Sequence, residues 1–438
     1  MERATVKEPV YEFVIMAVFL AAILTLVPLP GLLGPAQAVD VDWNINMRTV
    51  NSDNFSRLPT GSEDTGTQFT LTSGLDLAWT RGGSSYSLGG EVGSEWVDND
   101  QDTRNLVYRL NTNLQFNRRS NHYVNITANA SQDTTIPEED LLNRNRVRED
   151  RFTASIATGQ RRTSGTSGTA SSWEIGLSQE DANRPSTKSR STRFNALTSW
   201  KSGPGGDFTL SGSALKGDDK ETDNKWREGE ISTGLTNSLS RRTTRGITLS
   251  WSGSKTETKT GQTLSRLDNI SLVVSRRSEI SEVSRVGFSL GGNGLEADGA
   301  GREWSGQAGF TFDSQLEKRL NFNLDSSVST RVFRNADRTP ELSRTDQISV
   351  GLDLGLSRSW GAFTTTSYGK DKFPKGTAGM PASLSRRDER FNVRLGIRGQ
   401  PSQGSSLTAS MTVEMVNSNL ITADFEENRL ELAASIVF

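Results

Sequence analysis

Apolar and polar side chains alternate with a period of two residues along most of this chain. Within residues 322–332, for example, Phe322 and Leu324 alternate with Asn323. Successive side chains of a β-strand point to opposite faces, so the pattern predicts strands with one apolar and one polar face. No convincing 3.6-residue period occurs, and the predicted fold class is all-β. The same alternation is clear in the stretches 69–79, 106–116, 304–313, 348–357 and 391–398.

The connections between these segments alternate between short turns and longer polar stretches such as 51–66, 131–148 and 370–385. About twenty strands are predicted, within a range of 18–22 because strand boundaries are hard to place. A soluble sheet with one wet face gives the same alternation. Short periplasmic turns and longer external loops are typical of a transmembrane antiparallel up-and-down barrel, which is the predicted architecture. An even number of strands places both ends of the barrel in the periplasm.

Composition supports a polar interior. The chain has 33% hydrophobic residues and a mean hydropathy of −0.54, which is too polar for an ordinary globular core of this length. In a barrel, only the lipid-facing half of each strand must be apolar. The formal net charge of −2 gives no reason to expect a nucleic-acid partner. Cysteine is absent, which excludes disulfides and thiolate metal sites.

The N-terminus predicts export. Residues 13–27 form an uncharged apolar run, followed by two prolines and by Ala36-Gln37-Ala38. This order is typical of a secretory signal peptide, here residues 1–38, cleaved to leave one barrel domain, residues 39–438. A retained membrane anchor is the alternative. No later segment approaches the roughly 18 apolar residues that a membrane helix needs.

The C-terminal residues LELAASIVF place Leu430, Leu432, Ala434, Ile436 and Phe438 on one strand face. This end resembles the closing strand of bacterial outer-membrane β-barrels, in which a terminal Phe is an assembly signal. The resemblance implies an outer-membrane location. It also implies the barrel-assembly machinery, outer-membrane lipid and lipopolysaccharide as partners. Pairing between the last strand and the first would remove the edges of the sheet.

Tryptophan gives a further test of this topology. We expect aromatic girdles at both membrane interfaces. The predicted periplasmic girdle holds Trp43, Trp79, Trp173, Trp200 and Trp360. The predicted external girdle holds Trp96, Trp226 and Trp304, and Trp251 fits less well.

The sequence argues against an enzyme. The single histidine, His122, lies in a predicted periplasmic turn without neighbouring catalytic groups. The acidic stretch 98–102 lacks the spacing of a calcium-binding loop, so we interpret it as a solvated loop. No phosphate-binding glycine motif occurs. We therefore predict no enzymatic activity and no cofactor or metal.

A candidate constriction loop lies between residues 133 and 150. In general porins, the connection at this position folds into the lumen. Opposed charges at such a constriction would set a transverse field that filters solutes. A solvated external loop is the alternative. The acidic and basic members of the loop are Glu138, Glu139, Asp140, Arg144, Arg146 and Arg148.

Two other sets of charged residues are candidate functional residues: basic pairs in turns and charged residues that face the lumen. Basic pairs mark several predicted periplasmic turns, where they would attract anions or lipid headgroups, or anchor the barrel at the interface. These turns include Arg118, Arg119, Arg161, Arg162, Arg241, Arg242, Arg276, Arg277, Lys318 and Arg319. The candidate lumen residues are Asp76, Glu91, Arg109, Asp325, Arg331, Asp353, Arg394 and Arg398. Their mixed signs predict no strong ion selectivity. We expect no plug domain, because no globular segment precedes the first strand.

The segment 47–97, with Asp53-Asn54 and Arg81-Gly82-Gly83, resembles porin-like barrels associated with exopolysaccharide systems. The resemblance suggests passage or secretion of a polysaccharide, with periplasmic export components as further partners. The leading hypothesis is a channel for diffusion or export of polar solutes. A sleeve around a periplasmic or multihaem electron-transfer partner is the first alternative. The second is a structural or adhesive surface barrel.

Overall fold

The computed structural model describes residues 39–438 except 56, 59–61, 82, 99–102, 117–120, 136–146, 164–169, 185–186, 203–205, 221–222, 298–302, 335–339, 376–384 and 421–422. The predicted signal peptide, residues 1–38, lies outside the described residues. Among the residues that are described, no helix is long and apolar enough to cross a membrane.

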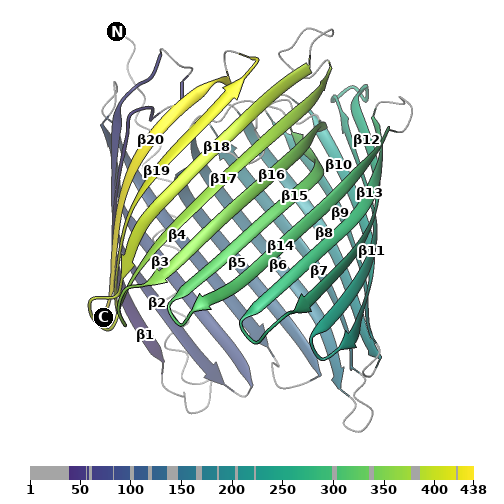
Figure 1. Ribbon diagram of the computed structural model, residues 1–438, viewed down its shortest axis with the longest axis horizontal. Coiled ribbons are helices and arrows are strands. Elements are labelled where there is room, and N and C mark those ends of the chain that lie inside the picture. Colours follow the sequence, from purple (N-terminus) through teal and green to yellow (C-terminus); the bar gives the residue numbers. More distant parts are fainter. Residues whose placement is uncertain are drawn as a thin grey trace.

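Twenty antiparallel strands form one sheet (Figure 1). The first ten are β1 (Asp40–Ser52), β2 (Gly66–Arg81), β3 (Ser84–Asp98), β4 (Thr103–Phe116), β5 (His122–Thr135), β6 (Val147–Thr163), β7 (Ala170–Arg184), β8 (Thr187–Ser202), β9 (Gly206–Asp219) and β10 (Lys225–Ser240). The second ten are β11 (Thr243–Glu257), β12 (Thr263–Glu279), β13 (Ser284–Ala297), β14 (Glu303–Glu317), β15 (Leu320–Arg334), β16 (Pro340–Gly355), β17 (Trp360–Lys375), β18 (Ser385–Gly399), β19 (Ser405–Ser418) and β20 (Phe425–Val437).

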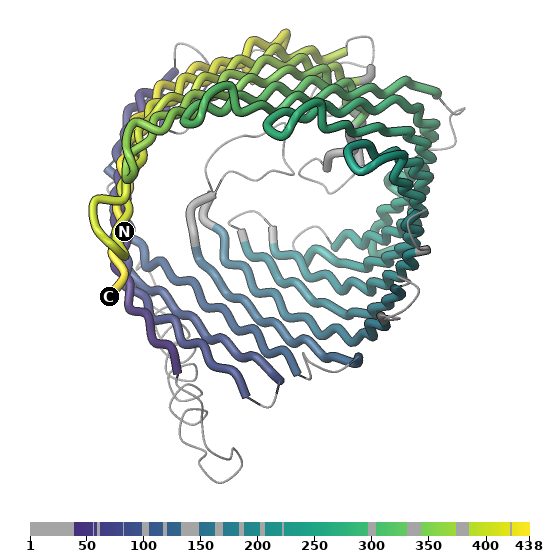
Figure 2. The backbone as a smooth tube through the Cα atoms, turned by 60° about the horizontal axis from the view of Figure 1, so that its bottom comes forward, coloured from purple at the N-terminus to yellow at the C-terminus, as the bar shows by residue number. Residues whose placement is uncertain are grey.

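The sheet closes on itself. Each strand pairs with its neighbours in the sequence, and β1 pairs with β20 from Asn44 opposite Val437 to Ser52 opposite Arg429. Figure 2 shows the resulting ring, with β1 in purple beside β20 in yellow. Closure pairs the first strand with the last, so the described sheet does not end in two edge strands, which a lipid environment could not satisfy. The predicted closed antiparallel barrel of about twenty strands is confirmed.

Apolar side chains gather on the outer face of the wall. Across β1 and β2, Trp43 opposes Leu75 and Met47 opposes Leu71, and all four are exposed. Exposed apolar surface on this scale is unfavourable in water and suited to a lipid-facing band. Other members of the band are Leu177, Phe194, Ile231, Ile247, Leu272, Leu395 and Leu432.

The strands extend farther than the alternation predicts. They contain 13 to 17 residues, whereas crossing a bilayer takes about 9–11. Polar stretches between the alternating segments also belong to strands, since β7 runs to Arg184, β8 starts at Thr187 and β13 runs to Ala297. In these end regions polar residues occupy both faces, so apolar alternation disappears although backbone pairing continues.

Aromatic rings meet near both ends of the barrel. Trp79 stacks on Tyr86 at 5.4 Å near the end that carries the C-terminus, and Phe69 lies 5.3 Å from Trp96 near the other end. Trp226 departs from the girdle prediction. It lies on the inner face of β10, is 5% exposed, and covers Gly217, where a Cβ atom would lie 2.2 Å from the indole. Near the strand ends, the presence of a tryptophan therefore does not show whether its side chain points to the lipid or into the lumen.

Candidate functional site

The inner face of the barrel is the candidate site. Side chains on the concave face of a closed sheet converge, so strands separated by one strand can make contact there. Asn46 of β1 donates to Glu91 of β3 at 2.9 Å, and Gln307 of β14 donates to Ser271 of β12 at 2.8 Å. These contacts assign the polar face of each strand to the lumen.

The strand register places the candidate lumen residues on this inner face. Asp76 accepts a hydrogen bond from Asn44 at 3.1 Å, and Asp353 forms an ion pair with Arg398 two strands away. Arg331 lies in β15 at a position of the same register. The remaining members, Glu91, Arg109, Asp325 and Arg394, have the same orientation. The strand period alone therefore located this set, although their role in transport stays a prediction.

Ion pairs and exposed arginine side chains line the lumen near the seam. Arg48 of β1 pairs with Glu431 of β20 at 2.9 Å, and Arg394 of β18 approaches the same carboxylate at 3.9 Å. The guanidinium groups of Arg394 and Arg398 lie 5.6 and 5.9 Å from the Phe363 ring. Side chains of Arg48, Arg394 and Arg398 keep 43–57% of their surface exposed. They form a basic patch that a solute in the lumen would meet.

A recess of about 320 Å³ adjoins this patch. Arg48, Thr72, Glu91 and Arg109 line it together with Asn46. Its wall thus carries guanidinium groups and a carboxylate from different strands, which provides hydrogen-bond donors and acceptors for a polar solute.

Many hydroxyl groups face the lumen along β9–β15. Charged side chains face the lumen there as well, among them Glu228, Glu230, Arg277, Arg285 and Asp313. A second recess of about 600 Å³ lies along β10–β15 and includes Thr236, Ser275, Thr311 and Asp325. Inward-facing hydroxyl residues of this wall include Ser211, Ser213, Ser232, Thr248, Ser250, Ser252, Ser271 and Ser289. Hydroxyl groups and charges of both signs are therefore combined on this wall of the lumen.

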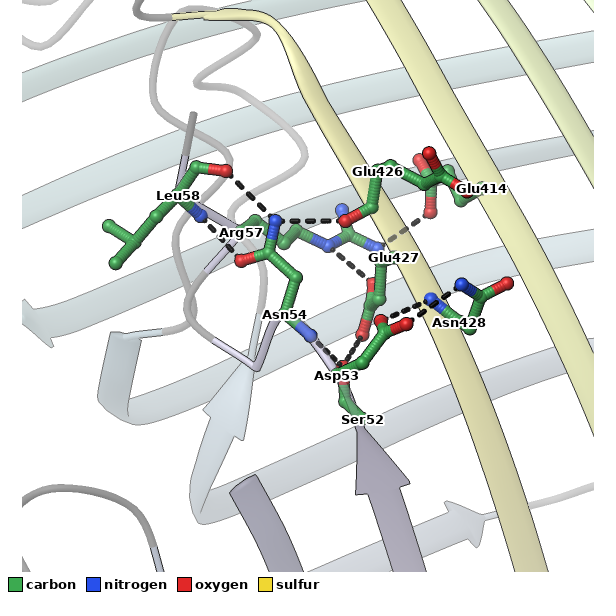
Figure 3. A network of polar contacts seen from close by, with 9 residues as sticks. All are labelled: Ser52, Asp53, Asn54, Arg57, Leu58, Glu414, Glu426, Glu427 and Asn428. Atoms are coloured by element: carbon green, nitrogen blue, oxygen red, sulfur yellow. Dashed lines mark hydrogen bonds and ion pairs between the residues drawn. The ribbon is translucent and has the colours of Figure 1, made fainter. Parts of the chain in front are cut away.

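At the end opposite the C-terminus, residues after β1 attach to the seam (Figure 3). The Arg57 guanidinium donates to Glu427 at 3.0 Å and to Glu414 at 2.7 Å. Ser52 also donates to Glu427, at 2.8 Å. Asn54, with no exposed surface, donates to the Glu426 carbonyl oxygen at 2.9 Å.

Arg57 adopts a positive φ of 54°, a conformation that non-glycine residues rarely adopt. The contacts with Glu414 and Glu427 stabilise this turn. Together with Asn54 they tie the β1–β2 connection to β19 and β20. The Asp53-Asn54 motif had suggested a family resemblance, but its partners lie more than 370 residues away and have no sequence signal.

A second buried cluster lies on the inner face of β18. Arg386 and Asp388 form an ion pair at 2.6 Å, with 1% and 0% of their side-chain surfaces exposed. The guanidinium lies 4.9 Å from the Phe373 ring, and Ser418 donates to Asp388 at 2.7 Å. Burial of the pair makes its hydrogen bonds structurally important. Two charges at i and i+2 are common in the sequence, so nothing there distinguishes this pair.

The other predicted sites are placed only in part. Glu138, Glu139, Asp140, Arg144 and Arg146 of the candidate constriction loop lie outside the described residues, and Arg148 lies in β6. Arg118 and Arg119 are outside the description too.

Two basic turns are confirmed in position, and two are corrected. Arg241 and Arg242 form the turn after β10, and Lys318 and Arg319 the turn after β14. The pair Arg161-Arg162 lies within β6, and Arg276-Arg277 within β12. The turn after β12 comprises residues 280–283 and contains the exposed apolar residues Ile280 and Val283. A search for polar residues therefore does not find this turn. Alternation directs Arg276 outward and Arg277 inward.

His122 begins β5, and its Nε2 lies 3.1 Å from the Gln160 side-chain nitrogen. Across the described ranges, no group of three or more His, Asp or Glu side chains is arranged to hold a metal ion. The absence of enzymatic activity and of a cofactor remains a prediction.

Comparison with solved structures supports the fold. The FrpB iron transporter from Neisseria meningitidis matches with a TM-score of 0.55 and 9% identity, covering 91% of this chain and 82% of the other. The copper transporter OprC matches with a TM-score of 0.54 and 8% identity, covering 92% of this chain and 81% of the transporter. The siderophore receptor PirA from Pseudomonas aeruginosa matches with a TM-score of 0.50 and 10% identity, covering 91% of this chain and 80% of the receptor. No protein-family model and no curated protein matches the sequence.

These neighbours are bacterial outer-membrane β-barrels, in agreement with the predicted outer-membrane location. They also correct one prediction. The expectation of a barrel without a plug domain is wrong as stated, because the matched receptors belong to a class that holds a plug in the lumen. Strand alternation reports on the two faces of the wall and carries no information about what fills the space inside.

Proposed function

We propose that this chain forms an outer-membrane channel for small polar solutes. The observation that carries the proposal is the polar inner face of the barrel, where hydroxyl groups and charged side chains of both signs line the lumen. Such a surface can exchange hydrogen bonds with a hydrated solute, and the exposed basic patch can orient a charged one. The lipid-facing band on the outer surface is consistent with a barrel that remains in the bilayer.

Saccharides are one solute class that the inward-facing hydroxyl groups of β9–β15 would suit, since both partners offer hydroxyl donors and acceptors. Exopolysaccharide, suggested by the sequence resemblance, has no support from the matched structures and remains a proposal. The periplasmic export components that it would need likewise remain a prediction.

Conductance across a planar lipid bilayer tests the channel. We expect the refolded protein to produce discrete conductance steps that grow with salt concentration. A barrel that inserts but stays electrically silent would contradict the proposal and favour the sleeve or the surface-barrel alternatives.

The absence of cysteine allows a sharper version of this experiment. Ser250 faces the lumen from β11, whereas the neighbouring Leu249 faces lipid. A charged, membrane-impermeant thiol reagent should change the conductance of Ser250→Cys and leave that of the matched Leu249→Cys unchanged. Equal responses of the two variants would argue against a water-filled path along this wall.

A further inference from the structure

An arginine without an ionic partner lies in the lumen beside the seam. Arg429 occupies the inner face of β20, opposite Ser52 of β1 and Thr412 of β19. Its side chain is half-buried, its Nε atom is buried without a hydrogen-bond acceptor, and it forms no ion pair among the described residues. Partial burial of an unpaired charge costs free energy, so packing within the barrel does not explain this residue. A bound anion would supply the missing partner.

The three arginines of the basic patch lie around Arg429. Arg394 is found across Thr412 in the same row of the sheet, and its Nε is also buried without an acceptor. The backbones of Arg394 and Arg429 are about 10 Å apart, given a strand spacing of about 4.8 Å. Arg48 and Arg398 share another row, four residues nearer the end that carries the C-terminus. We call Arg429 and the three arginines of the basic patch the arginine cluster.

The carboxylates that pair with the cluster are less exposed than its guanidinium groups. Glu431 forms an ion pair with Arg48, and Asp353 forms one with Arg398. The side chains of these two acids are 16% and 34% exposed, whereas those of the patch arginines are 43–57% exposed. The acids therefore orient the guanidinium groups from beneath, and a solute in the lumen meets mainly the arginines.

Two further carboxylates lie on the other side of Arg429, toward the end opposite the C-terminus. Glu427 precedes Arg429 by two residues on β20 and opposes Glu414 of β19. Arg57 binds both acids, which are largely buried. At this level of the wall, from β16 to β1, five arginines (Arg57 and the arginine cluster) thus meet four carboxylates. The surface that an anion meets there has a net positive charge.

An aromatic ring fixes the spacing of two cluster members. The Phe363 ring lies between the guanidinium groups of Arg394 and Arg398, 5.6 and 5.9 Å from their central carbons. It covers Gly396, where a Cβ atom would lie 2.7 Å from the ring. Ser410 also accepts a hydrogen bond from Arg394, at 3.3 Å. Donors that are held in place lose little conformational entropy when they bind a ligand.

A phosphoryl group fits the arginine cluster better than a carboxylate does. The guanidinium groups come from three strands, β1, β18 and β20, and reach the lumen from different positions. A phosphate monoester carries a charge of about −2 and three acceptor oxygens, so several guanidinium groups can bind it at once. A carboxylate carries one charge and two oxygens in one plane.

The recess next to the cluster offers groups for the rest of a ligand. Asn46, Thr70 and Thr72 line this recess of about 320 Å³. Their amide and hydroxyl groups can donate hydrogen bonds to the hydroxyl groups of a polyol and accept bonds from them. Glu91 and Arg109 of the same recess oppose each other and add no net charge.

We propose that the arginine cluster binds the phosphoryl group of a small phosphorylated sugar or polyol, with the hydroxyl groups of that solute in the adjoining recess. The inference rests on the proposed channel function and names the class of solute that the channel selects. It assigns Arg429 a role that no contact within the barrel supplies.

Isothermal titration calorimetry on the detergent-solubilised barrel tests the inference. At one pH and one ionic strength, we expect saturable binding of glucose 1-phosphate, weaker binding of inorganic phosphate, and no binding of glucose or acetate. Equal affinity for inorganic phosphate and for the ester would assign the cluster to the free ion and overturn the sugar phosphate. Equal binding of acetate would reduce the effect to general charge attraction and overturn the phosphoryl site. These measurements use the wild type and do not depend on the folding of any variant.

Arg429→Gln is the most direct variant, because Arg429 has no ion pair in the described chain and its removal leaves no carboxylate without a partner. We expect it to fold and to bind glucose 1-phosphate at least about tenfold more weakly, the loss expected for one hydrogen bond to a charged group. Arg193→Gln is the matched control. Arg193 is exposed on the inner face of β8, between Ser178 and Leu215, and lies outside the cluster.

The control removes the same charge from another wall and should bind as the wild type does. Equal loss in both variants, or undiminished binding by folded Arg429→Gln, would overturn the inference. A barrel that conducts potassium chloride but binds no phosphoryl probe would refute the inference and leave the channel standing. A barrel that binds the probes but never conducts would refute the channel instead.

Discussion

Trp43 and Phe438 meet at the seam where the barrel closes, with ring centroids 5.6 Å apart. The backbone nitrogen of Phe438 donates to the carbonyl oxygen of Trp43 at 2.8 Å, and the reverse bond spans 3.4 Å. The first and last strands of the barrel are therefore paired by backbone and by side chain at the same place. The C-terminal residue that resembles an assembly signal also completes the last pairing of the sheet.

We expect Phe438→Ala to lower the yield of folded barrel. The substitution removes an aromatic contact of about 0.5–1.5 kcal/mol and leaves the backbone pairing intact. The folded fraction can be measured by heat-dependent mobility on gels after refolding into vesicles. Val437→Ala alters the adjacent residue, which faces the lumen, and should fold normally. Equal losses in both variants would show that the strand end as a whole matters, and not the aromatic pair.

Arg57→Ala should destabilise the barrel strongly. The variant removes the Arg57 guanidinium from Glu427, which is 1% exposed, and breaking such a buried pair costs about 3–5 kcal/mol. Urea unfolding from lipid vesicles, followed by tryptophan fluorescence, measures the change. Lys259→Ala removes one partner of the exposed Lys259–Asp223 pair, with atoms 3.1 Å apart, and should leave the unfolding midpoint unchanged. A normal midpoint for Arg57→Ala would mean that the seam network contributes little.

Gly93 should tolerate no larger residue. A Cβ atom there would lie 1.9 Å from the Leu71 carbonyl oxygen, so Gly93→Ala must shift backbone, at about 1–3 kcal/mol. Gly306, in β14, has no atom within 4 Å of the corresponding position. Gly306→Ala is therefore the matched control and should unfold like the wild type. Identical unfolding curves for the two variants would refute the close approach at Gly93.

Arg394→Gln, Arg398→Gln should shift the conducting barrel toward cations. The change removes two exposed positive charges from the lumen while Glu431 and Asp353 remain. Reversal potentials in asymmetric potassium chloride report the shift. Arg394→Lys, Arg398→Lys keeps the charges and should retain the original potential. An unchanged potential in the glutamine variant would place the path of ions away from this patch.

The presence of the strands, and the face to which each side chain points, were predictable from the sequence. Both follow from the period of two, which backbone geometry alone imposes. The alternation of Phe322, Asn323, Leu324 and Asp325 needs no partner to assign faces. Strand ends were harder to predict, as at the 276–279 segment, where polar residues continue along β12 past the apolar band. Neither polarity nor propensity marks the point where pairing stops in such a segment.

The sequence by itself determined a closed lipid-facing wall of about twenty strands and the inward orientation of Asp76, Asp353 and Arg394. Both follow from local periodicity and from the need to satisfy every backbone group in lipid. Only the tertiary structure decided which charges meet, such as Arg57 with Glu427 and Lys216 with Arg227. Those meetings depend on register and on closure between residues far apart in the chain, and no local pattern encodes them.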